Sequence, residues 1–138
     1  MSVSVVGVLD RWQEEHPDFF VGGNEAGMML GKDVRGAEGA VWRRDAVLPL
    51  TARYIRVPPI LAVEVGGREE GEPELREKAK WYLGHGVAVV WLVLPETREV
   101  LVVTAGGETR HAVGERLPPH PALPGLEPPV ESFFRQLG

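Results

Sequence analysis

The hydrophobic residues of the N-terminal half change their spacing from helical to extended. Apolar side chains first recur at i, i+3, i+4 and i+7, which is one face of an amphipathic helix built on Val5, Val8, Leu9 and Trp12. Pro17 ends this helix, because proline cannot continue the helical hydrogen-bond pattern. Beyond it, short apolar runs bounded by glycines predict strands at 19–21, 28–30 and 40–48, with turns over 32–39.

One apolar run in the middle of the chain carries a single carboxylate. The run ILAVEV, residues 60–65, lies between Pro58-Pro59 and Gly66-Gly67, and its length and composition predict a buried strand. Side chains alternate across a strand, so Glu64 shares a face with Ala62. A buried carboxylate is costly unless a partner, a metal or a proton compensates it. The alternative is an edge strand whose Glu64 faces water.

The second half predicts a helix, a hairpin and a final helix. Pro73 suits the first turn of a helix that runs to about Leu83, and Lys78 lies beside its apolar face. We expect further strands at 87–94, 99–104 and 109–113, and a closing helix on Val130, Phe133, Phe134 and Leu137. This order predicts one α/β domain over residues 1–138, a mixed α+β fold whose mainly antiparallel sheet is flanked by helices.

Composition narrows the classes of function. The 138 residues contain no cysteine, which excludes disulfides, thiolate catalysis and cysteine-bound zinc. No segment has the pattern of a signal peptide or a membrane span, so we expect a cytoplasmic protein. The net charge of −5 argues against avid non-specific DNA binding but leaves room for a local basic site. Arginine greatly outnumbers lysine, as in a GC-rich and thermophilic source.

Three residues suggest metal-assisted chemistry. Asp45 and Glu64 fall on two predicted strands, and two carboxylates on neighbouring strands can hold Mg²⁺ or Mn²⁺ through oxygen ligands. Lys78, on the following helix, could orient a water or steady the charge of a phosphate. Alternatively, Asp45 forms a surface ion pair with Arg43 or Arg44. The histidines lack metal-ligand spacing, and no P-loop, dinucleotide fingerprint or serine elbow is present.

The stretch from 60 to 94 resembles the Uma-two family of putative restriction endonucleases, a branch of the PD-(D/E)XK nuclease superfamily. ILAVEV matches the family's acidic strand, and its spacing is kept by Lys78, Tyr82, Gly86, Val87 and Trp91. RRDAVL resembles the family's PDV strand and places Asp45 at its aspartate, although Arg44 replaces the proline. The ending LPGLEPPVESFF also looks like the family's closing segment.

This resemblance implies a restriction endonuclease-like fold and a Mg²⁺- or Mn²⁺-dependent DNA endonuclease. It implies Asp45 and Glu64 as metal ligands, and Lys78 as a catalytic lysine moved from the strand to the helix. Glu25, in the segment GGNEAG, is a further candidate ligand. We expect a homodimer, because cutting both DNA strands needs two sites, with the hairpin 91–103 and the closing helix as contact surfaces. A catalytically silent binding or assembly module and a hydrolase of other phosphate esters stay open.

Overall fold

A six-stranded sheet forms the centre of the computed structural model, which describes residues 3–23, 27–47 and 54–135. The strands lie in the order β1-β4-β5-β6-β7-β8. All neighbours are antiparallel except β5 and β6, which are parallel. The bounds are β1 (Phe19–Gly22), β4 (Gly39–Arg43), β5 (Leu61–Val65), β6 (Val89–Leu94), β7 (Glu99–Thr104) and β8 (Gly107–Ala112). The predicted mixed, mainly antiparallel sheet is confirmed.

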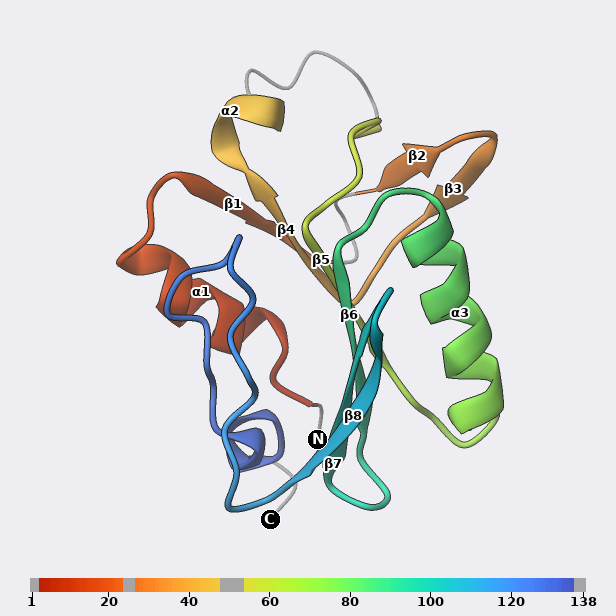
Figure 1. Ribbon diagram of the computed structural model, residues 1–138, viewed down its shortest axis with the longest axis vertical. Coiled ribbons are helices and arrows are strands. Elements are labelled where there is room, and N and C mark those ends of the chain that lie inside the picture. Colours follow the sequence, from red (N-terminus) through yellow and green to blue (C-terminus); the bar gives the residue numbers. More distant parts are fainter. Residues whose placement is uncertain (1–2, 24–26, 48–53, 136–138) are drawn as a thin grey trace.

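Helices cover the two faces of the sheet (Figure 1). On one face lie α1 (Val6–Glu14) and the C-terminal segment, which share an apolar core with the sheet. On the other lies α3 (Glu72–Gly84), which connects β5 to β6 and packs against both. The sequence predicted both helices, to within a residue or two at each end. None of the helices in the described ranges is long and apolar enough to cross a membrane.

The central pair of strands is buried on both faces. Every residue of β6 is buried, as expected for its continuous apolar run. In β5, Leu61 and Val63 belong to the core on the α1 face, whereas Ala62 belongs to the core on the α3 face. The alternation directs Glu64 toward α3 as well. Since β5 lies between β4 and β6, the interpretation of β5 as an edge strand is wrong.

The local sequence at both ends of α3 fixes where the helix begins and ends. The Glu74 carboxylate accepts a hydrogen bond of 3.1 Å from the Gly71 backbone N–H, which satisfies one of the free donors of the first turn. Pro73 lies in that first turn, where its missing N–H costs nothing. At the other end, Gly86 adopts φ +97°, a left-handed conformation suited to glycine.

Two segments of the N-terminal half differ from the prediction. Part of the turn-rich segment forms β3 (Asp33–Arg35), which pairs with β2 (Met28–Leu30) in a separate hairpin. The strand predicted over 40–48 ends at Arg43 and is followed by α2 (Arg44–Val47), so Asp45 lies on a helical turn. The pairing explains this end, because Arg43 is opposite Phe19, the first residue of β1, and no β1 residue pairs beyond it.

The predicted dimer surfaces are largely internal. The closing helix is a single 3₁₀ turn, η1 (Val130–Phe133), whose apolar side chains are buried on the α1 face, and Leu137 lies outside the described residues. Trp91, Val100 and Leu101 of the hairpin 91–103 are buried within the sheet. Both segments therefore contribute mainly to the core, and their role as contact surfaces of a dimer stays a prediction.

Candidate active site

Glu64 is the buried carboxylate of β5, and two side chains of α3 hold it. Only 6% of the residue is exposed. The Tyr82 hydroxyl donates a hydrogen bond of 2.6 Å to Glu64 Oε2, and the Lys78 ammonium donates one of 3.4 Å to Oε1. Lys78 and Tyr82 are four residues apart and therefore point from the same side of the helix. Each carboxylate oxygen is thus held by one α3 side chain.

The environment of Glu64 opposes its ionisation in part. Burial raises the pKa of Glu64, and the Glu38 carboxylate raises it further. The Tyr82 hydroxyl and the Lys78 ammonium lower this pKa. The raising effects are larger, so the pKa of Glu64 is higher than usual. Burial and the Glu64 carboxylate likewise raise the pKa of Tyr82, so its hydroxyl stays protonated and remains a donor. The site therefore holds a carboxylate that a cation would stabilise.

Lys78 bridges Glu64 to a loop. Its ammonium lies 2.6 Å from Glu70 Oε2, in the segment between β5 and α3, and its side chain is 32% exposed. Partial burial disfavours the charged form, but Glu70 and Glu64 outweigh this and raise the pKa of Lys78. Lys78 is therefore a cation, with part of its surface open to solvent.

A small pocket of about 240 Å³ opens over these groups, and β3 supplies part of its wall. Arg35 lines it together with Glu64, Lys78 and Trp81. The Arg35 guanidinium stacks 4.7 Å from the centre of the Trp81 ring, while the Trp81 indole N–H donates to Asp33 Oδ2 at 3.1 Å. The pocket therefore presents a second cation beside the buried carboxylate.

The structure does not bring Asp45 to this site. Its side chain is 76% exposed on α2, lies 3.4 Å from Arg43 Nε, and lines a different pocket. Gly39 pairs with Val63, so Glu64 lies near the start of β4, whereas α2 follows the other end of that strand. Arg43 lies five residue steps along the extended chain from Glu38, a span of about 16 Å, and Asp45 lies two residues further on. The alternative of a surface ion pair with Arg43 matches the geometry, and one cation cannot bridge Asp45 and Glu64 here.

Glu38 is the acid that the sequence analysis missed. Its backbone N–H donates to Val63 O at 3.0 Å, and the β4–β5 register continues from Gly39 to place it beside Glu64. Its carboxylate is close enough to raise the pKa of Glu64. The sequence did contain a signal for this residue. Glu38 directly precedes β4, and because β4 runs antiparallel to β5, the start of β4 lies beside the end of β5 that carries Glu64. The assignment of 32–39 to turns concealed it. Glu25 lies outside the described residues.

The donor set suits a hard cation that keeps much of its water. Glu38 and Glu64 offer carboxylate oxygens, and one or two carboxylates with several waters are what Mg²⁺ commonly takes in proteins. Among the described residues, no three acidic or histidine side chains gather closely enough to enclose an ion by themselves. The two residues therefore fit a partly hydrated Mg²⁺ or Mn²⁺, and they do not form a complete protein cage.

Comparison with known proteins places the chain in a family. Residues 2–131 match the model of the family Uma2, which is described as "Putative restriction endonuclease". The chain belongs to the Uma2 family. The resemblance of its motifs to that family is thereby confirmed, and within this Uma2 chain the matched region includes Glu38, Glu64, Lys78 and Tyr82.

The fold of this Uma2 chain is also similar to a solved structure. A protein from Anabaena variabilis, described as a putative nuclease belonging to DUF820, superposes with a TM-score of 0.82. The two are 16% identical, and the match covers 96% of this chain and 77% of the other. At this identity the likeness shows a shared fold. None of the curated proteins matches the chain.

Proposed function

We propose that this Uma2 protein is a divalent-metal-dependent endonuclease that hydrolyses phosphodiester bonds in DNA. The observation that carries the proposal is the buried Glu64, held by Tyr82 and Lys78 with a second carboxylate, Glu38, beside it. A buried acid with a perturbed pKa and a specific charge partner beside a pocket is typical of a functional site. Membership in a family described as "Putative restriction endonuclease" supports a nuclease and favours DNA as its substrate.

Glu38 and Glu64 are the residues that would hold Mg²⁺ or Mn²⁺. A bound cation of this kind supplies Lewis-acid polarisation of the phosphate and lowers the pKa of a bound water. In the hydrolysis, a water oxygen bonds to phosphorus, the bond from phosphorus to one ester oxygen breaks, and that oxygen takes up a proton. Tyr82 keeps the Glu64 carboxylate in one orientation, because its buried hydroxyl donates a hydrogen bond to Oε2.

Lys78 and Arg35 supply positive charge on the substrate side of the site. Both line the pocket over Glu64, and an ammonium and a guanidinium are well suited to the non-bridging oxygens of a phosphodiester. Lys78 can also orient the attacking water, since it reaches Glu64 and is partly exposed. They place positive charge where the phosphate would bind, in a chain whose net charge is −5.

One observation favours a second candidate, a catalytically silent binding or assembly module. The Lys78 ammonium lies closer to Glu70, at 2.6 Å, than to Glu64, at 3.4 Å. An acidic loop residue is therefore the nearer ion-pair partner of the lysine. In a silent module this contact would be permanent. In an active enzyme, the substrate phosphate would displace Glu70, and replacing Glu70 with glutamine would preserve or raise the cleavage rate.

A plasmid-nicking assay with Mg²⁺ or Mn²⁺ tests the function. We expect wild type to nick supercoiled DNA only when the cation is present, and Glu64→Gln to lose cleavage while keeping the fold by circular dichroism. Asp45→Asn is the matched control and should cleave like wild type, since its carboxylate is exposed and remote. Equal rates for wild type and Glu64→Gln contradict the proposal. Wild type that binds Mn²⁺ in calorimetry but cleaves none of the tested substrates supports the silent module.

We further propose that cleavage of both strands of a duplex uses two copies of the chain, one site for each strand. Light scattering of the protein with a duplex of uniform length measures the number of copies bound. One chain per duplex, together with cleavage of both strands, contradicts this proposal.

A further inference from the structure

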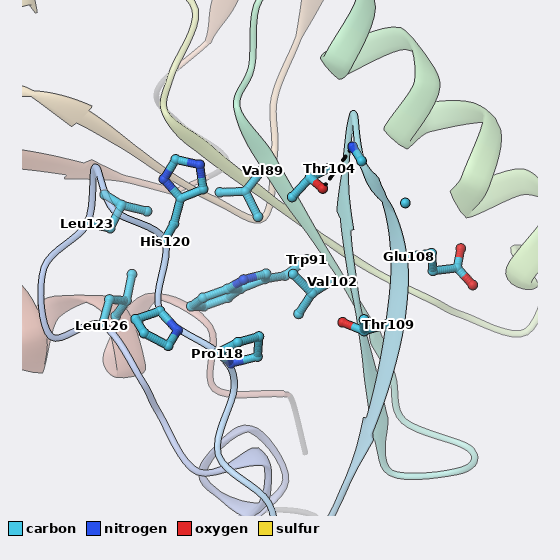
Figure 2. Close-up of a pocket in the computed structure, with 13 residues that line it drawn as sticks. Val89, Trp91, Val102, Thr104, Glu108, Thr109, Pro118, His120, Leu123 and Leu126 are labelled. Atoms are coloured by element: carbon cyan, nitrogen blue, oxygen red, sulfur yellow. Dashed lines mark hydrogen bonds between the residues drawn. The ribbon is translucent and has the colours of Figure 1, made fainter.

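A second pocket lies on the face of the sheet opposite Glu64. It measures about 440 Å³, within the range of small-molecule sites, and strands β6, β7 and β8 form one side of it. The segment from Pro118 to Leu126 forms the other side, as Figure 2 shows. Its floor is apolar and almost wholly buried, made of Val89, Trp91, Val102, Leu123 and Leu126. Such a concave apolar surface suits a small apolar molecule.

Trp91 places an unpartnered donor in this pocket. Of the chain's four tryptophans, three donate their indole N–H within the protein: Trp12 to Pro124 O, Trp42 to Val57 O and Trp81 to Asp33 Oδ2. Among the described residues no acceptor receives the N–H of Trp91, which is only 2% exposed. No described side-chain nitrogen is both fully enclosed and unpartnered, so this N–H must be reachable, and Trp91 lines the pocket.

His120 contributes a second donor. Its Nδ1 accepts a hydrogen bond of 3.0 Å from the Ala122 backbone N–H, so the neutral ring carries its proton on Nε2. Within the described part of the chain, nothing accepts that Nε2–H. Figure 2 shows His120 on one side of the Trp91 ring and Pro118 on the other. The indole N–H of Trp91 and the Nε2–H of His120 are therefore two donors among the residues that line this pocket.

The polar lining offers few free acceptors to match these donors. The Thr104 hydroxyl oxygen accepts from the Gly106 backbone N–H at 3.2 Å, and Glu108 is held by Arg76 at 2.9 Å. Thr109 shares its hydroxyl with His111 Nε2 at 2.8 Å. A ligand that satisfies this pocket must therefore bring the acceptor itself.

From this excess of donors over an apolar floor we propose that the pocket binds a small planar aromatic molecule that carries a hydrogen-bond acceptor, a ring nitrogen or a carbonyl oxygen. The ring would pack against the apolar floor beside the edge of the Trp91 indole, and its acceptor would take the indole N–H. The proposal is independent of the nuclease, because alternation along β6 places Trp91 on the α1 face, while Leu92, paired with Glu64, faces α3. Either can fail without the other.

Nuclear magnetic resonance on the ¹⁵N-labelled full chain tests the proposal with a matched pair of probes. Isoquinoline has a ring nitrogen that accepts a hydrogen bond, whereas naphthalene has the same shape and no acceptor. We expect isoquinoline to shift the Trp91 indole signal saturably and to bind about tenfold more tightly than naphthalene, the effect of one hydrogen bond. Absence of a saturable shift up to the solubility limit, or equal affinity for the two probes, overturns the proposal.

Two variants locate the binding. Trp91→Phe keeps an aromatic ring but removes the N–H, so isoquinoline should lose about tenfold in affinity while naphthalene is unaffected. Thr109→Trp fills the pocket from exposed strand β8 without changing the core, and it should abolish binding of both probes. Thr97→Trp, at the exposed turn between β6 and β7, is its control and should bind like wild type. If Trp91→Phe does not fold, undiminished binding by Thr109→Trp alone suffices to refute the site.

Discussion

The two ends of strand β4 carry acids of very different character. At the end that meets β5, Glu38 lies beside a carboxylate that is 6% exposed and gripped by two side chains of α3. At the other end, Asp45 is 76% exposed and pairs with an arginine that is itself largely in water. Both acids are themselves exposed and lie beside the same strand, so the difference is in the neighbour that each one meets. The difference shows that chemistry in this fold depends on where neighbouring strands and helices exclude water, and not on the presence of an acid in a strand.

The physical reason lies in the effective dielectric. Solvent screens the charge of Asp45, and exposed ion pairs of its kind contribute roughly 0–1 kcal/mol. Around Glu64, the apolar cores of the sheet and α3 exclude water, so each neighbouring charge acts more strongly. The same low dielectric raises the pKa of Glu64 and makes a cation there favourable.

The largest predicted difference concerns binding of the cation. Glu38→Gln should weaken Mn²⁺ binding in calorimetry, and slow Mn²⁺-dependent cleavage, by about a hundredfold, because loss of one charged ligand removes roughly two steps of 1.4 kcal/mol. Asp45→Asn should leave both quantities unchanged. The amide replacements keep the size of each side chain, so folding is not the variable under test.

The opposite result would reverse our assignment of the ligands. If Asp45→Asn abolished Mn²⁺ binding and Glu38→Gln did not, the ion would have to bind at the α2 end of β4, as the sequence motif implied. If neither variant changed binding, the carboxylates of β4 would have no part in it.

The second test removes the hydrogen bond that Tyr82 donates to the buried Glu64. Tyr82→Phe deletes the hydroxyl that donates to Glu64 at 2.6 Å and leaves a buried carboxylate with one donor fewer. Hydrogen bonds to charged groups contribute about 1.5–3 kcal/mol, so the free energy of unfolding should fall by that amount in urea titrations. Addition of Mn²⁺ should restore part of this loss, since a cation binding only the folded state stabilises it. A change under about 0.5 kcal/mol would mean that the hydroxyl does little for the folded state.

Much of the site around Glu64 was predictable from the sequence. The run 60–65 between its proline and glycine pairs predicted the strand, the alternation placed Glu64 on a covered face, and helical spacing placed Lys78 beside the apolar side of α3. These features are local, because periods of 2 and 3.6 residues fix which side chains share a face. The contact between Lys78 and Glu64 then follows from the packing of one helix on one strand.

The partner acid was not predictable in the same way. Choosing between Glu38 and Asp45 required the antiparallel register of β4 on β5, which is set by residues far apart in the chain. The predicted strand 40–48 placed Asp45 within the sheet, whereas β4 ends at Arg43, opposite Phe19, the first residue of β1. The closing helix differed as well: its apolar spacing correctly marked buried side chains, but the segment forms a single 3₁₀ turn over Val130–Phe133.

The third test uses pH to ask whether the ionisation of Glu64 changes the free energy of unfolding. The folded-state pKa of Glu64 is raised above its unfolded value of 4.5, so its contribution to stability is present below pH 4.5 and is lost as pH rises through the folded pKa. Wild type should therefore lose stability relative to Glu64→Gln as pH rises through that window. Glu72 should show the opposite sign, because hydrogen bonds from Arg110 lower the pKa of Glu72 and its contribution is lost as pH falls through the folded pKa.

Urea titrations of wild type, Glu64→Gln and Glu72→Gln from about pH 3 to about pH 8 cover both windows and measure both slopes. Parallel stability curves for wild type and Glu64→Gln would show that Glu64 has the same pKa in the folded and unfolded protein. The burial and contacts described for it would then have no electrostatic consequence.

The smallest predicted effect is at the α2 end. Arg43→Ala removes the partner of Asp45, and since both side chains are more than half exposed, stability should change by less than about 0.5 kcal/mol. Some of even this change would come from the contact of the Arg43 guanidinium with the Phe19 ring, 5.8 Å from its centre, so Asp45→Ala isolates the ion pair. Mn²⁺ affinity and the pH dependence of Glu64 should be unchanged in both variants. A loss of more than about 1 kcal/mol on removing Asp45 would show that this end of β4 is not the solvent-screened surface its exposure indicates, and the contrast with Glu64 would have to be explained by something other than burial.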